Sequence, residues 1–190
     1  IKGRRLEGGY LEISGSISSQ FISALLLIGP MLEKGLELKM TDTIISRPYI
    51  DLTLCMMRDF GAAVEWTDVD TISVAPKPYT SRRYYIESDW SAGSYWYEIM
   101  ALSDDSEATV RLEGLMDGSR QGDSVVKYIF SLLGVKTSFE TTDPCVPNTV
   151  TLRRHKCLLP RLEYDFTGSP DLAQTLVVCC ALMDIKFHFK

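Results

Sequence analysis

The sequence predicts an α/β fold built from a repeated unit of strand, helix, strand, helix, strand and strand. Hydrophobic residues make up 45% of the 190-residue chain, so it can bury a sizeable core. Segments with the periodicity of strands and of helices alternate along the chain. The second set of segments follows the first at a spacing of 73 residues, both between Ser18 and Ser91 (91 − 18) and between Gly61 and Gly134 (134 − 61).

The first unit contains the clearest helix of the chain. Pro48 falls in the first turn of this helix, where proline is tolerated, and Gly61 lies at its expected C-terminal end. Ile50, Leu54 and Met57 fall on one face, as the core-facing side of a helix requires. The elements expected in this unit, roughly residues 10–83, are a strand at 10–13, a helix at 18–32, a strand at 36–40, a helix at 46–61 and strands at 63–66 and 71–75.

The second unit repeats this order and a third unit begins after it. The expected elements are a strand at 84–87, a helix at 91–102, a strand at 108–113, a helix at 123–133, strands at 135–140 and 149–153, a strand near 162, a helix from 171 and a strand at 185–189. Units of this kind need neighbours to cover their apolar surfaces, and the third one is incomplete. We therefore expect the chain to be a piece of a larger protein.

Composition disfavours several functional classes. The net charge of −5 argues against a nucleic-acid partner, which needs a basic face. No apolar run reaches the roughly 18–20 residues of a membrane span, and the N-terminal residues lack the apolar region of a secretory signal. The cysteines show no C-x-x-C spacing, so we expect no metal site and free thiols in a reducing cytosol. They are Cys55, Cys145, Cys157, Cys179 and Cys180.

Polar side chains gather at the predicted start of the first helix. Ser16, Ser18, Ser19 and Gln20 come directly before an apolar run. A helix N-terminus presents unpaired backbone N–H groups and a partial positive charge, so small hydroxyl side chains there can hold a phosphate or a sugar-like hydroxyl group. A simple N-cap is the competing interpretation, and it accounts for one serine but not for three serines and a glutamine.

Five short segments match the motifs of one enzyme family in order and spacing. They are residues 15–27 (GSISSQFISALLL), 46–51 (SRPYID), 87–95 (ESDWSAGSY), 121–123 (QGD) and 169–173 (SPDLA). The chain resembles 5-enolpyruvylshikimate-3-phosphate (EPSP) synthase over nearly its whole length. The first two segments separate this family from its relative, the UDP-N-acetylglucosamine enolpyruvyl transferase.

The resemblance implies an enolpyruvyl transferase-like fold of two domains. Each domain is an inside-out α/β barrel (an alpha-beta prism) of three such units, with the active site in the cleft between them. Residues 1–86 would be the last part of one domain and 87–190 the start of the other, an incomplete fold with a crossover strand at 85–89. Ser88 stands where the family commonly has glycine, and Ala92-Gly93 replaces Ser-Ala, which leaves the hinge geometry open.

The resemblance also implies roles for six residues, with no metal or cofactor. Ser18, Ser19 and Gln20 would bind shikimate 3-phosphate, and Gln20 would also reach phosphoenolpyruvate. Ser46 would hydrogen-bond the 3-phosphate, and Tyr49 would pack against the shikimate ring. Asp171 would accept hydrogen bonds from ring hydroxyls and serve as candidate base for the 5-hydroxyl. That hydroxyl adds to phosphoenolpyruvate through a tetrahedral intermediate, and phosphate leaves. The intact enzyme is expected to be a cytoplasmic monomer.

Each of the later helix starts also has a purely structural interpretation. Ser46 fits an N-cap, Tyr49 a half-buried packing residue, and Asp171 a carboxylate favoured by the helix dipole. Asp89 and Asp123 are expected to be caps or hinge contacts. Core and domain-interface packing is expected of the aromatic group, Trp90, Tyr95, Trp96 and Tyr97, and solvated side chains are expected at Arg47, Arg82 and Arg83.

The cations that should bind the substrates are missing from the matched segments. Two phosphates and two carboxylates require several Arg and Lys side chains, which the family takes from segments that this chain does not contain. We therefore expect the isolated chain to be inactive. Two alternatives stay open: a relative of the UDP-N-acetylglucosamine enolpyruvyl transferase, which Ser18-Ser19-Gln20 disfavours, and a non-catalytic repeat domain.

Overall fold

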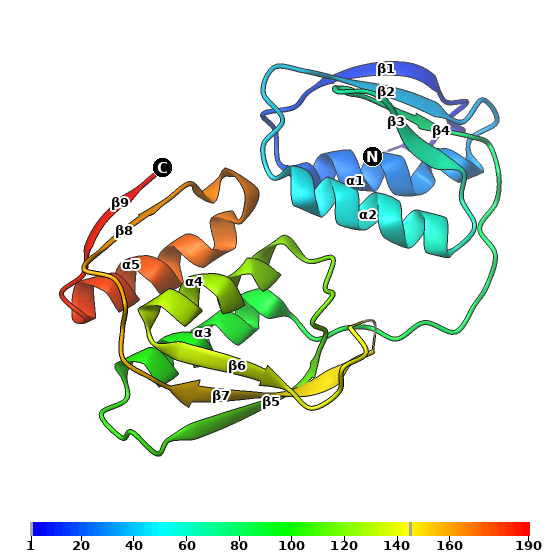
Figure 1. Cartoon of the computed structure of the whole chain (residues 1–190). Coiled ribbons are helices and arrows are strands. Elements are labelled where there is room, and N and C mark those ends of the chain that lie inside the picture. Colours follow the sequence, from blue (N-terminus) through cyan, green and yellow to red (C-terminus); the bar gives the residue numbers. More distant parts are fainter. Residues whose placement is uncertain (1, 145) are drawn as a thin grey trace. The chain divides into compact units, whose positions relative to one another are not determined.

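A four-stranded sheet with two helices on one face forms the first part of the computed structural model (Figure 1). The strand order is β1-β2-β4-β3, with β1 parallel to β2 and the other pairs antiparallel. The elements are β1 (Gly9–Ser14), α1 (Ser19–Ile28), a 3-10 turn (Gly29–Met31), β2 (Leu36–Thr41), α2 (Arg47–Asp59), β3 (Val64–Asp68) and β4 (Thr71–Val74). The structure describes residues 2–144 and 146–190, so the thiol predicted at Cys145 lies outside it.

The predicted helix faces pack on this sheet. Ile50, Leu54 and Met57 of α2 are buried, as the sequence pattern predicts, and they share one core with Ile22 and Leu26 of α1. Alternate residues of β2 and β4 supply the other side of the core. The first helix is shorter than predicted, because Gly29-Pro30 turns the chain into a 3-10 turn instead of continuing α1 to residue 32.

The second part of the chain carries a three-stranded antiparallel sheet and a separate parallel pair of strands. The orders are β5-β7-β6 and β8-β9. The elements are α3 (Trp90–Leu102), β5 (Thr109–Leu115), α4 (Val126–Leu133), β6 (Val135–Phe139), β7 (Asn148–Arg154), β8 (Arg161–Tyr164), α5 (Ala173–Leu182) and β9 (Lys186–Phe189), with 3-10 turns at Gly122–Val125, Phe166–Gly168 and Pro170–Leu172.

The core of this part lies between α3, α4, α5 and the sheets. Trp90 and Tyr97 are fully buried in it, as predicted for the aromatic group, and Ser94 Oγ lies 2.9 Å from Thr175 Oγ1 where α3 meets α5. Tyr95 and Trp96 are not core residues of this unit, since they are 45% and 49% exposed, and packing at a domain interface stays a prediction for both. They fall on the side of α3 that the core does not cover.

The predicted repeat is visible in the strand orders. The order β5-β7-β6 repeats β2-β4-β3, and β2 and β5 begin 73 residues apart, at Leu36 and Thr109 (109 − 36). The unit β8-α5-β9 repeats the parallel unit β1-α1-β2. The strand predicted at 84–87 is wrong: this segment is extended but forms no ladder, and Ser88 N donates to Gly114 O (2.8 Å) beyond it.

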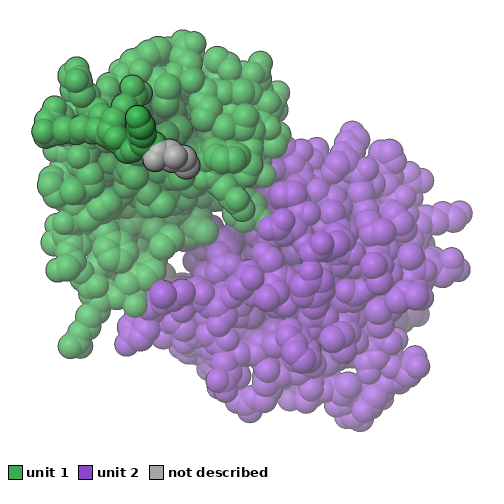
Figure 2. Space-filling view, turned by 180° about the vertical axis from the view of Figure 1, so that it is seen from behind, with its two compact units in different colours: residues 1–84 green, residues 85–190 purple. Residues whose placement is uncertain are grey.

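The chain divides into two compact units, Ile1–Tyr84 and Tyr85–Lys190, which are coloured separately in Figure 2. Each unit has its own buried core. In the described part of the chain, no helix combines the length and the apolar character needed to cross a membrane.

Candidate functional site

Two helix starts share one edge of the first sheet. Strands β1 and β2 run parallel with Ser14 opposite Thr41 at their carboxyl ends, and α1 and α2 each begin a few residues after those ends. Because the carboxyl ends of parallel strands meet at one edge, the residues at the two helix starts lie there together. The structure thus brings five of the six predicted site residues to one edge: Ser18, Ser19, Gln20, Ser46 and Tyr49.

The two loops of this edge are joined by backbone hydrogen bonds. Gly15 N donates to Thr41 O (2.6 Å), and Ile45 N donates to Gly15 O (3.1 Å). A side chain at Gly15 would be tightly packed, because a Cβ built there lies 3.0 Å from Ile44 Cγ1 and 3.1 Å from Thr41 O. Glycine therefore suits the close approach of the loops, and a larger residue would have to displace its neighbours slightly.

A hydroxyl network reinforces the same junction. Ser14 Oγ lies 2.7 Å from Ser16 Oγ and donates to Asp42 Oδ2 (3.0 Å), which also accepts from Thr41 Oγ1 (3.2 Å). Asp42 adopts a left-handed backbone (φ 65°), which aspartate tolerates better than most residues. Ser16, predicted at the helix start, thus bonds within the loop rather than at the first turn of α1.

The first turn of α1 uses one of its serines as a cap. Ser18 Oγ accepts a hydrogen bond from Gln20 N (3.3 Å), so the N-cap interpretation is correct for Ser18. Ser19 is half-buried and Gln20 is exposed. The edge therefore presents hydroxyl and amide groups beside the positive end of α1.

Ser46 occupies the N-cap position of α2 without capping it. Its side chain makes no capping hydrogen bond, and its carbonyl accepts from Tyr49 N (3.1 Å). Its backbone is left-handed (φ 55°), a conformation that costs a serine about 1 kcal/mol or more. The interpretation of Ser46 as a simple N-cap is therefore wrong. Tyr49 is half-buried, as predicted if it packs against the protein.

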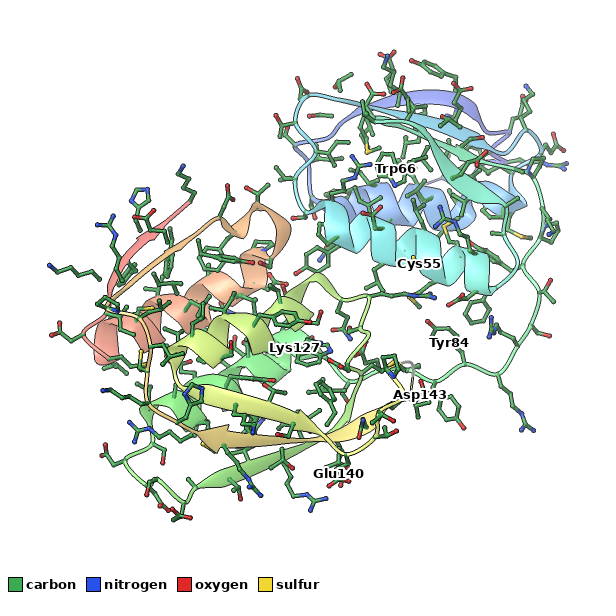
Figure 3. The ribbon with its side chains drawn as sticks, in the orientation of Figure 1. Cys55, Trp66, Tyr84, Lys127, Glu140 and Asp143 are labelled. Atoms are coloured by element: carbon green, nitrogen blue, oxygen red, sulfur yellow. The ribbon has the colours of Figure 1, made fainter. Side chains whose placement is uncertain are left out.

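Contacts behind the edge hold α1, α2 and β3 in place. Ser23 Oγ of α1 lies 2.9 Å from Thr53 Oγ1 of α2. Arg47 lies 3.9 Å above the ring of Trp66 and donates to Val69 O (3.0 Å), while Asp51 Oδ1 accepts from Trp66 Nε1 (2.8 Å) (Figure 3). Arg47 is thus not the freely solvated side chain that the sequence predicted, because it packs against β3.

Asp171 belongs to the second unit. It lies exposed in the 3-10 turn Pro170–Leu172, after β8 and directly before α5. Because β8-α5-β9 repeats β1-α1-β2, Asp171 occupies the place in its repeat that the helix-start residues occupy in the first unit. Its approach to the other five residues stays a prediction.

Polar residues at the other helix starts of the second unit have structural partners. Asp89 caps α3 by accepting from Ser91 N (2.9 Å), as predicted. Asp123 is not a cap: it is 1% exposed and accepts a hydrogen bond from the Ser91 hydroxyl. The sequence analysis assigned no role to Glu87, whose carboxylate accepts four hydrogen bonds. Its position as the first residue of the 87–95 segment could have drawn attention to it.

Among the residues that the structure describes, neither the two buried thiols of α5 nor the metal-ligand residue types provide a second candidate site. Burial raises the pKa of Cys179 to about 12 and that of Cys180 to about 11, so both are protonated at neutral pH. Across residues 2–144 and 146–190, no group of His, Cys, Asp and Glu side chains could hold a metal ion.

Solved structures with a similar fold are enolpyruvyl transferases. An EPSP synthase from Acinetobacter baumannii aligns over 80% of this chain and 32% of its own, with a TM-score of 0.53 and 20% identity. The enolpyruvyl transferase NikO from Streptomyces tendae aligns over 86% and 38%, with a TM-score of 0.54 and 15% identity. At these identities the likeness establishes the fold alone, which is that of the enolpyruvyl transferases.

The sequence comparison is more specific. The family described as EPSP synthase (3-phosphoshikimate 1-carboxyvinyltransferase) matches residues 1–188, so the chain belongs to the EPSP synthase family. A 3-phosphoshikimate 1-carboxyvinyltransferase from Bacteroides fragilis is 48% identical over 189 residues. One from Methanosphaerula palustris is 35% identical over 179 residues, which are 94% of this chain and 40% of that protein. The chain spans 44% of the length of the Bacteroides relative.

Proposed function

We propose that this chain is part of a 3-phosphoshikimate 1-carboxyvinyltransferase. That enzyme would transfer the enolpyruvyl group of phosphoenolpyruvate to the 5-hydroxyl of shikimate 3-phosphate and release phosphate, a step of aromatic amino-acid biosynthesis. The family match supports this proposal. The observation that carries it is the shared edge of β1 and β2, where the starts of α1 and α2 present hydroxyl, amide and backbone N–H groups together.

The edge suits a phosphate monoester. The positive ends of α1 and α2 favour a dianion, and the backbone N–H groups of Ser19 and Arg47, the first residues of the two helices, can donate to its oxygens. Ser18, Ser19 and Ser46 would add hydroxyl donors to the 3-phosphate. Gln20 would bind both substrates through its amide, and Tyr49 would cover the shikimate ring from the first turn of α2.

Asp171 would complete the site from the second unit. As a base, its carboxylate would take the proton of the 5-hydroxyl while the oxygen forms a bond to C2 of phosphoenolpyruvate, the C2–C3 double bond breaks and C3 takes up a proton. The tetrahedral intermediate would then lose a proton from C3 as the bond between C2 and the phosphate oxygen breaks, which re-forms the C2–C3 double bond and releases phosphate. A carboxylate needs hydrogen-bond contact with that hydroxyl to be effective.

The remaining properties that we propose follow the family. The longer protein would be a cytoplasmic monomer, would use no metal or cofactor, and would be the target of glyphosate. Its further Arg and Lys side chains would come from parts of the protein outside this chain, because the polyanionic substrates need several cations.

Acceptor choice in the longer protein tests this function. Phosphate release from phosphoenolpyruvate should require shikimate 3-phosphate and should not occur with UDP-N-acetylglucosamine. Asp171→Asn should lower kcat by about 10²–10⁴-fold, the usual contribution of a general base. Asp165→Asn, which removes the carboxylate that caps the neighbouring 3-10 turn, is the matched control and should leave kcat within a few-fold. Turnover with the UDP-sugar, or full activity in Asp171→Asn, would contradict the proposal.

A further inference from the structure

The linker between the two units is attached to the first unit as far as Tyr84. Thr80 N donates to Phe60 O (2.7 Å), and the guanidinium of Arg82 donates to Asp59 O (2.7 Å). The ring of Tyr84 packs on Phe60, with ring centroids 5.4 Å apart (Figure 3). These contacts hold the linker against the carboxyl end of α2.

Glu87 attaches the other end of the linker to the second unit. Each oxygen of its carboxylate accepts two hydrogen bonds. The donors are Trp90 Nε1 (2.7 Å) and Met116 N (2.8 Å) to Oε1, and Ser119 Oγ (2.7 Å) and Gln121 Nε2 (3.1 Å) to Oε2. Hydrogen bonds to an ionised acceptor are the stronger kind, so one side chain fixes both the start of α3 and the loop after β5.

The neighbours of Glu87 reinforce this attachment. Gln121 accepts from Trp90 N (2.9 Å) and donates to Ser88 O (2.9 Å). Ser88 bonds to the end of β5 through its own N–H and hydroxyl groups. Beyond the ring of Trp90 lies the buried ammonium of Lys127, which is 5.5 Å from that ring and 2.6 Å from Asp117 Oδ1 (Figure 3).

Only two residues separate the two attachments. Tyr85 and Ile86 are 81% and 88% exposed. We infer that Glu87 is a positioning residue: its carboxylate makes residues 87–89 part of the second unit and confines the pivot between the units to Tyr85 and Ile86. The role of Glu87 stands independently of the proposed reaction.

The repeat relates one partner of the Glu87 carboxylate to a residue of the candidate site in the first unit. Ser119 lies 73 residues after Ser46 (119 − 46), in the loop between β5 and the 3-10 turn Gly122–Val125 that precedes α4. In the first unit, we propose that this position faces a phosphate. In the second unit, the corresponding hydroxyl binds Glu87, an anion supplied by the chain itself. The hydroxyl that corresponds in the repeat to that of Ser46 is therefore engaged by a carboxylate of its own unit.

Removing the Glu87 carboxylate from the 190-residue chain tests the inference. We call the four groups that donate to it the cradle: Trp90 Nε1, Met116 N, Ser119 Oγ and Gln121 Nε2. In Glu87→Ala, amide exchange at Met116 should accelerate by at least about tenfold, because charge-assisted hydrogen bonds are lost. Fast backbone motion measured by NMR relaxation should spread from Tyr85 and Ile86 to Ser88. Formate should reverse both changes, because a small carboxylate can refill the cradle, and chloride at equal ionic strength should not.

The control is Glu113→Ala on β5, whose exposed side chain has no part in the cradle; it should leave exchange and motion unchanged. If Glu87→Ala does not fold, Ser119→Ala removes one donor and should accelerate exchange at Met116 by a smaller factor. Unchanged exchange at Met116, acceleration that formate does not reverse, or fast motion that already includes Ser88 in the unmodified chain would each overturn the inference.

Discussion

At the scale of single residues, Gly15 sets the distance between the two loops of the candidate site. We predict that Gly15→Ala lowers the free energy of unfolding by about 1–3 kcal/mol, because the new methyl group is forced against Ile44 and Thr41 O. Urea unfolding measures this change. Gly3→Ala is the matched control, since a Cβ there has nothing within 4 Å. Equal stability of the two variants would mean that the loops can separate freely.

The buried thiol of Cys179 makes the stability of the chain depend on alkaline pH. Burial, and to a smaller extent the nearby Cys180, raises its pKa from 9.0 to about 12. The folded state therefore keeps a proton that the unfolded state loses near pH 9, so stability is complete below pH 9 and falls as the pH rises towards 12. In urea unfolding between pH 8 and 10.5, Cys179→Ala should lose stability less steeply than the unmodified chain. Parallel pH profiles would contradict this assignment.

Several residue-scale features could be predicted from sequence and others could not. The cap at Ser18 and the buried stripe of α2 follow from local preference and periodicity. The left-handed backbone of Ser46 does not, because it results from the junction of two loops that only the folded sheet brings together. Likewise, the hydrogen bond to buried Asp123 and three of the four donors to Glu87 depend on segments some 30 residues away in the chain.

At the scale of elements, the starts of α1 and α2 differ in what their serines do. Ser18→Ala should destabilise the chain by about 1 kcal/mol, because it removes a cap. Ser46→Gly should instead stabilise it by about 0.5–1 kcal/mol, because glycine relieves the left-handed strain. It should also weaken binding of shikimate 3-phosphate, since a hydroxyl is lost. Thermal unfolding compares the two variants, and a destabilising Ser46→Gly would show that the hydroxyl has a structural role.

Element order was predictable because hydrophobic periodicity repeats at a constant spacing. The predictions failed where a local signal competed with tertiary contacts. Residues 84–87 have strand-like composition, but Glu87 and the adjacent Ser88 bond to the loop after β5 and to its end. The helix predicted at 18–32 is too long, because Gly29-Pro30 begins a 3-10 turn after α1 ends at Ile28.

At the scale of the whole molecule, we propose that most of the cations needed for the reaction lie outside this chain. Arg47, the cation nearest in sequence to Ser46, is engaged with Trp66 and Val69. We predict that the 190-residue chain alone releases no phosphate above background from phosphoenolpyruvate and shikimate 3-phosphate. A continuous phosphate assay measures this, with the longer protein as positive control. Turnover by the chain alone would mean that its own residues suffice.

The central claim is that the shared edge of β1 and β2 binds a phosphate monoester. Titrating the chain with shikimate 3-phosphate, while recording the NMR signals of its backbone amides, tests this claim most directly. We predict saturable shifts concentrated at Ser18, Ser19, Gln20 and Ser46, and much weaker shifts with shikimate, which lacks the phosphate. Silence of these amides at millimolar ligand, or equal shifts with shikimate, would contradict the account and favour a repeat domain without a substrate site.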